Sequence, residues 1–178
     1  MIKAPERVEI GRLVLQRPRV DDVESIFRRY ASDPDVTRYL SWPVHLSIDQ
    51  TRAFLSFSDD EWRRWPAGPY LAFSREDGTL IGGTGLAFET ATRAATGYVL
   101  ARDAWGRGLA TEALNATVDI ARGAGIERLY AICHADHRAS ARVLEKCGFA
   151  REGVLRRFLE FPNLRPGPSD VLKYARVP

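Results

Sequence analysis

The spacing of apolar residues along the chain predicts a series of helices and strands. From Leu109 to Arg122 apolar residues recur at helical spacing, with Leu109, Ala113, Leu114 and Val118 on one face. Period-two alternation and short apolar runs indicate strands elsewhere. The predicted helices are 20–31, a helix capped by Ser47 that runs to Arg64, 109–122 and 138–146, with a short helical turn at 36–40. The predicted strands are 8–17, 70–74, 80–88, 96–101, 128–134, 149–161 and 170–176.

The order of these elements predicts the fold class. A hairpin signal at Glu76-Asp77-Gly78 precedes a region in which strands and helices alternate, and strands follow at the end. This order favours an α/β protein with one mixed sheet and helices on both faces. Because no repeat or linker divides the chain, we expect residues 1–178 to form a single domain.

Composition narrows the partners that the chain is expected to have. Hydrophobic residues make up 45% and charged residues 28% of the sequence, which is typical of a globular protein. The net charge of +3 does not indicate nucleic acid, but it suits an anionic ligand. The chain has neither a signal-peptide core nor an apolar run near the roughly 18 residues of a membrane helix, so no membrane partner and a cytoplasmic location are expected. Cys133 and Cys147 fit no metal spacing and are expected to be free thiols, with Cys133 in the core.

The turn from Trp105 to Thr111, Trp-Gly-Arg-Gly-Leu-Ala-Thr, is the strongest candidate for binding chemistry. It joins a short apolar strand to the start of a helix, and its glycines would let the backbone approach an anion closely. It lacks the third glycine of a dinucleotide fingerprint and the Gly-Lys-Ser/Thr of a Walker loop. Spacing alone leaves two interpretations open, a phosphate-binding turn and a plain tight turn.

Two segments carry a resemblance to a known family. Gly108 and Ala110 fill the two small positions of the pattern Gln/Arg-x-x-Gly-x-Gly/Ala, and Trp105 stands where the polar residue usually does. Asp136–Phe149, reading DHRASARVLEKCGF, is similar to a second block of the same family. The chain thus resembles the GNAT superfamily of N-acetyltransferases, and more narrowly its RimJ/RimL-type branch. The resemblance implies a GNAT-like fold with a mostly antiparallel central sheet.

The resemblance implies acetyl-coenzyme A as cosubstrate. Main-chain groups at the helix start would hold the pyrophosphate, and the pantetheine arm would pair with the strand edge at Leu100–Arg102. The side chains of Arg102 and Arg107 either meet phosphates or remain solvated. His137 occupies the family's asparagine position beside the pantetheine arm. The predicted cofactor-binding residues are Leu100, Arg102, Arg107, Gly108, Ala110, Thr111 and His137. No metal site is expected.

Ser140 is the predicted catalytic residue, because it matches the serine of the family block and could stabilise or protonate the leaving thiolate. The alternative is that Ser140 only faces the start of a helix. That helix contains no tyrosine to act as a general acid. Relatives often carry an acidic residue where this chain has Ala95-Thr96, so the general base is not identified. The remaining candidates are Glu89, His134, His137, Glu160 and water.

The predicted reaction is direct transfer of an acetyl group to a primary amine. A lysine amine has a pKa of about 10.4 and a chain-terminal amine about 8, so neutralising the lysine at pH 7 costs several kcal/mol more. A site without a carboxylate base therefore favours a protein or peptide N-terminus as acceptor. Two alternatives stay open: a small amine such as a polyamine or aminoglycoside, and a coenzyme A-binding sensor with weak catalysis. A monomer and a homodimer are equally compatible with the sequence.

Overall fold

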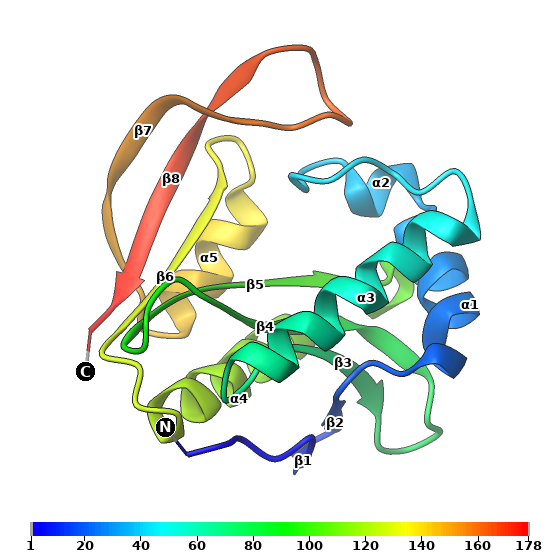
Figure 1. The fold of residues 1–178 in the computed structure, drawn as a ribbon. Helices are drawn as coiled ribbons and strands as arrows, with labels where there is room; N and C mark the ends of the chain where they lie inside the picture. Colours follow the sequence, from blue (N-terminus) through cyan, green and yellow to red (C-terminus); the bar gives the residue numbers. More distant parts are fainter. Residues whose placement is uncertain (1, 178) are drawn as a thin grey trace.

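The computed structural model describes residues 2–177 and contains one eight-stranded sheet of order β1-β2-β3-β4-β5-β6-β8-β7 (Figure 1). Neighbouring strands are antiparallel throughout, except for the central pair β5 and β6. This agrees with the predicted mixed, mostly antiparallel sheet. The strands are β1 (Arg7–Ile10), β2 (Leu13–Gln16), β3 (Pro69–Ser74), β4 (Leu80–Phe88), β5 (Arg93–Leu100), β6 (Arg128–His134), β7 (Ala150–Glu160) and β8 (Pro168–Arg176).

Helices cover both faces of the sheet (Figure 1). The α-helices are α1 (Val23–Ile26), α2 (Pro34–Thr37), α3 (Ile48–Arg64), α4 (Leu109–Gly123) and α5 (Arg138–Lys146), and η3 (Arg102–Ala104) is a 3₁₀ turn. Thr84 on β4 meets Thr117 of α4 through hydroxyls 3.0 Å apart. The adjacent residue of β4, Gly83, faces the Tyr30 side chain, next to α1. Since successive strand residues face opposite ways, α4 and α1 lie on opposite faces.

The first third of the chain departs from the sequence prediction. The predicted strand 8–17 is two strands, because Gly11 turns the chain with φ +49°. The predicted helix 20–31 is a 3₁₀ turn (Val20–Asp22), then α1, then a π-helical turn (Phe27–Ala31). The Ser32 N–H donates to the Phe27 carbonyl five residues back, at 3.1 Å, which widens this last turn. Further along the chain, the central strand β5 begins at Arg93 rather than at the predicted Thr96.

The feature that positions the site is the separation of β5 from β6. Their parallel pairing covers only Arg93–Ala95 and Arg128–Tyr130, and β6 then pairs with β8 up to His134. Beyond these three residue pairs, one edge of β5 has no neighbouring strand among the described residues 2–177. We call this gap, which begins at Thr96 and Ala131, the β5–β6 opening. Among residues 2–177, no helix is long and apolar enough to cross a membrane.

Candidate active site

The start of α4 has the geometry of an anion site. Gly108 is its N-cap residue and adopts a left-handed conformation with φ +78°. A Cβ at Gly108 would meet only the Arg12 guanidinium, at 3.7 Å, so conformation rather than space favours glycine. The next residues, including Ala110 and Thr111, present first-turn N–H groups that have no acceptor inside the helix. Free N–H groups at a helix start suit an anion such as the pyrophosphate of a nucleotide cofactor, and the binding of that group here stays a prediction.

Arg12, which the sequence did not indicate, braces this turn from the β1–β2 connection. Its guanidinium donates to the Arg107 carbonyl at 3.1 Å and to the Glu112 carboxylate at 3.0 Å. The Arg107 carbonyl is therefore tied to the first turn of α4. The Arg107 side chain is exposed. Because Arg12 and Arg107 lie 95 residues apart, no local pattern could have found this contact.

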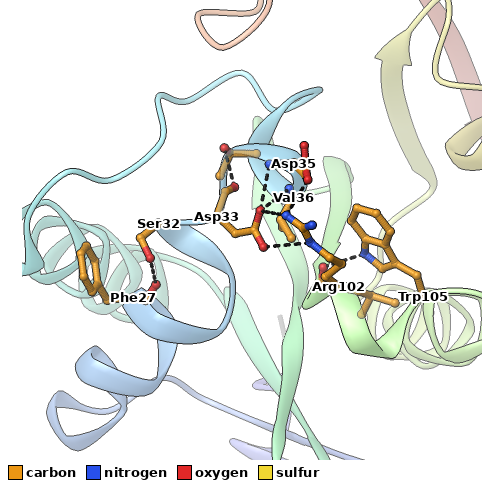
Figure 2. A network of polar contacts seen from close by, with 9 residues as sticks. Phe27, Ser32, Asp33, Asp35, Val36, Arg102 and Trp105 are labelled. Atoms are coloured by element: carbon orange, nitrogen blue, oxygen red, sulfur yellow. Dashed lines mark hydrogen bonds and ion pairs between the residues drawn. The ribbon is translucent and has the colours of Figure 1, made fainter.

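Two further predicted contacts have unexpected partners (Figure 2). The Arg102 guanidinium pairs with Asp33 at 2.7 Å and with Asp35 at 2.6 Å, so its side chain is engaged by carboxylates rather than presented to a phosphate. Ala101 N–H donates to β4, so the Leu100 carbonyl faces the other way, toward the β5–β6 opening. There it accepts a hydrogen bond from the Trp105 indole at 2.9 Å. Trp105 thus occupies part of the strand edge predicted for pantetheine.

A cavity of about 630 Å³ lies at the β5–β6 opening. We call the part lined by Tyr98, Cys133 and Ser140 the inner part of the cavity, and the part lined by aromatic side chains its outer part. Of the residues between 2 and 177 that line it, none is aspartate, glutamate, lysine or arginine. The outer aromatic residues are Tyr39 and Trp42 from the loop after α2, Phe54 and Phe57 from α3, and Phe161 after β7.

Ser140 lies in this cavity within reach of a tyrosine that sequence reasoning did not select. The Tyr98 hydroxyl, on β5, donates to Ser140 Oγ at 3.1 Å. Burial raises the pKa of Tyr98 to about 12, so the phenol stays protonated at neutral pH. Because Ser140 Oγ accepts this bond, its own hydrogen remains available for donation, and the Cys133 thiol, which also lines the cavity, is one partner within its reach. The dipeptide Gly97-Tyr98 in the central strand could have pointed to this tyrosine. Its hydrogen-bond partner Ser140, however, lies 42 residues further along the chain.

The candidate bases differ in whether they line the cavity. His137 lines the cavity and stacks on Tyr39 with ring centroids 4.5 Å apart, and burial lowers its pKa. His134 is buried, and its Nδ1 accepts the Asp136 N–H at 3.1 Å. Glu89 lies at the paired end of the sheet, bonded to Tyr130 and Arg93. Neither Glu89 nor Glu160 lines the cavity. Cys133 and Cys147 are buried free thiols, and burial raises the pKa of Cys133 to about 11.

The structure thus combines three features: the parallel strands β5 and β6 that separate, the left-handed Gly108 at the start of α4, and the Tyr98–Ser140 hydroxyl pair. Together they suit the binding of an anionic cofactor next to a polar reaction site. The chain belongs to the GNAT family of acetyltransferases, since the model of the acetyltransferase (GNAT) domain matches residues 12–150. The chain is accordingly an N-acetyltransferase that uses acetyl-coenzyme A.

Known proteins support this assignment. The chain is 31% identical to the uncharacterized N-acetyltransferase YoaA of Bacillus subtilis (strain 168), over 92% of this chain and 93% of the relative. Its fold matches an acetyltransferase of Salmonella typhimurium that modifies the N-terminal serine of ribosomal protein L7/L12, with TM-score 0.83, 23% identity and coverage of 97% and 99%. It also matches the microcin C7 self-immunity acetyltransferase MccE, solved with acetyl-CoA and AMP, with TM-score 0.82, 20% identity and coverage of 98% and 97%.

Proposed function

We propose that the enzyme acetylates the terminal α-amino group of a peptide or protein. The observation that carries this proposal is the absence of any carboxylate from the lining of the cavity among residues 2–177. A lysine-like amine, with a pKa of about 10.4, would need a strong base or a compensating charge to react as the neutral amine. A terminal amine, with a pKa of about 8, loses its proton at little cost near neutral pH.

The residues of the cavity divide the chemistry between them. Acetyl-coenzyme A supplies an activated acetyl thioester when bound. The first-turn amides of α4, including those of Ala110 and Thr111, hold its pyrophosphate. Ser140 donates a hydrogen bond to the sulfur and keeps its own proton, so that it stabilises the coenzyme A thiolate that leaves as the carbon–sulfur bond breaks. Tyr98, which donates to Ser140 Oγ, fixes the direction of that hydroxyl. His137, neutral and in the cavity, takes up the proton that the amine loses as its nitrogen bonds to the acetyl carbon.

An acceptor panel tests the proposed function. Release of free coenzyme A is measured with peptides that have a free N-terminus, the same peptides blocked at the N-terminus but containing lysine, spermidine, and an aminoglycoside. We expect turnover with the free N-termini and at least tenfold lower kcat/KM with every other acceptor. Turnover of blocked lysine peptides or spermidine at equal rates would overturn the assignment of a terminal amine. The Salmonella structural neighbour, which modifies an N-terminal serine, supports the choice of peptides.

A further inference from the structure

We infer that the acceptor carries an aromatic or large apolar group beside its amine, which for a peptide means an aromatic first residue. This inference rests on the proposed function and concerns the outer part of the same cavity. Its basis is the combination of aromatic walls, open sheet backbone in the floor at Gly97, and a roof, the loop that carries Tyr39 and Trp42, which is held in a fixed position.

Within the described part of the chain, the walls of the outer cavity are aromatic and carry no ionised group. Tyr39, Trp42, Phe54 and Phe161 line it, and the pKa values of His45 and His137 are lowered by burial, so both imidazoles are neutral at pH 7. A polyamine or aminoglycoside would bring cations into this space without a partner. A free amino acid would bring an unpaired carboxylate. Both lose hydration without compensation, whereas an apolar group is favoured.

The floor of the outer cavity includes bare sheet backbone at Gly97, whereas the Tyr30 hydroxyl and the Val99 side chain lie over Gly83. Thr84 and Tyr98 are register partners that face α4 and α5, so their neighbours Gly83 and Gly97 face the opposite side, toward the aromatic walls. Both glycines line the cavity. A Cβ at Gly97 would meet no atom within 4 Å, which means that the space above this residue is open. A flat ring therefore has room to lie against the backbone at Gly97.

The roof of the outer cavity, the loop after α2 that carries Tyr39 and Trp42, is held in place by the Asn163 side chain. The Asn163 amide nitrogen donates to the Thr37 carbonyl at 2.8 Å and to the Trp42 carbonyl at 2.9 Å. The Asn163 amide oxygen accepts the Val44 N–H at 2.8 Å. Asn163 follows β7, so these three bonds tie the loop that carries Tyr39 and Trp42 to the far end of the sheet. A fixed aromatic wall selects its ligand by shape as well as by polarity, because it does not refold around other groups.

Kinetics with matched acceptors test the inference. kcat/KM is measured for peptides that differ only in a first residue of phenylalanine, serine or lysine, and for phenylalanine amide and free phenylalanine. We expect at least a tenfold preference for the phenylalanine peptide over the serine and lysine peptides, and for phenylalanine amide over free phenylalanine. Equal values for the phenylalanine and serine peptides would overturn the inference.

Gly97→Val is the diagnostic variant, because valine suits a strand and its side chain would fill the open space of the floor. We expect the phenylalanine-to-serine preference to fall below threefold in a variant that stays folded by circular dichroism. Ala87→Val, at an exposed position of the neighbouring strand β4 outside the cavity, is the control and keeps the preference. A Gly97→Val enzyme with the full preference would show that the first residue binds elsewhere.

Asn163→Ala supplies an independent test of the roof. Asn163 is a positioning residue, because its side chain contacts backbone rather than the cavity. We therefore expect the substitution to raise KM for the phenylalanine peptide at least fivefold with little change in kcat. A fall in kcat with unchanged KM would contradict this role.

The results with the different acceptors also separate the inference of an apolar group from the proposed function. Turnover of phenylalanine amide but of no peptide supports an apolar acceptor and overturns only the peptide terminus, whereas acetylation of spermidine alone overturns both.

Discussion

At the scale of single residues, Ser140 makes the sharpest prediction. Ser140→Ala removes the hydroxyl that would donate to the leaving sulfur, so we expect kcat to fall at least tenfold while the Kd of acetyl-coenzyme A changes less than twofold. Steady-state kinetics and calorimetry measure the two quantities. Tyr98→Phe keeps the ring and removes only the hydrogen bond to Ser140 Oγ, and a smaller loss is expected. Full turnover in Ser140→Ala would leave Ser140 as a helix-start residue without a chemical role.

Ala110 tests the position of the pyrophosphate. Alanine and glutamate both form helices well, and an acidic side chain near a helix start is normally stabilising. If the pyrophosphate binds at the first turn of α4, Ala110→Glu repels it and weakens coenzyme A binding at least tenfold, or about 1.4 kcal/mol. Calorimetry gives the affinity, and circular dichroism confirms the fold. A folded variant with normal affinity would place the pyrophosphate elsewhere.

At the scale of elements, Asp33 contributes both a helix cap and an ion pair to the contact between α2 and η3. Its side chain accepts the N–H groups of Asp35 and Val36 at the start of α2 and pairs with Arg102 (Figure 2). The Arg102 hydrogen bond lowers the pKa of Asp33. A lowered pKa in the folded state means that the stabilisation is complete above the unfolded value of about 3.9 and is lost as pH falls through the folded value.

Two substitutions at Asp33 separate its cap from its charge. Asp33→Asn keeps a capping oxygen and loses the ion pair, so it is expected to be slightly less stable than wild type at pH 7 and equally stable below the folded pKa of Asp33. Asp33→Ala also loses the cap, which costs about 1 kcal/mol more. Urea denaturation at pH 7 and in acid measures both differences. A gap between wild type and Asp33→Asn that persists in strong acid would contradict the charge effect.

Elements whose pattern is local were predictable from sequence, and elements shaped by distant partners were not. β6 and α5 have the predicted bounds, because a short apolar run and a strongly amphipathic nine-residue segment each specify one structure. The prediction of a single helix over residues 20–31 was wrong, because the hydrogen bond from the Ser32 N–H to the Phe27 carbonyl sets the end of this segment. The site divides in the same way. The turn at Gly108 was visible in the sequence, whereas the partners of Ser140, Arg102 and Arg107 come from strands and loops far along the chain.

At the scale of the whole molecule, ligand binding is expected to raise the melting temperature. Acetyl-coenzyme A at 100 times its Kd should add about 2.7 kcal/mol to the free energy of unfolding. For a chain of this size, that corresponds to roughly 5–10 °C. NAD and ATP at equal concentration should give much smaller shifts, because the turn matches neither of their usual fingerprints. Differential scanning calorimetry measures the shifts, and the absence of a shift with millimolar acetyl-coenzyme A would contradict the proposed site.

The strand order has a consequence for how the protein is made. β8 lies between β6 and β7, although it follows both in the chain. While a ribosome is still translating residues before Pro168, the far edge of β6 has no partner, and β7 has nothing to join. The half of the sheet that carries Cys133 can therefore assemble only after β8 emerges from the exit tunnel. Until then, the nascent chain exposes a strand of seven residues, Arg128–His134, which is a natural target for a chaperone.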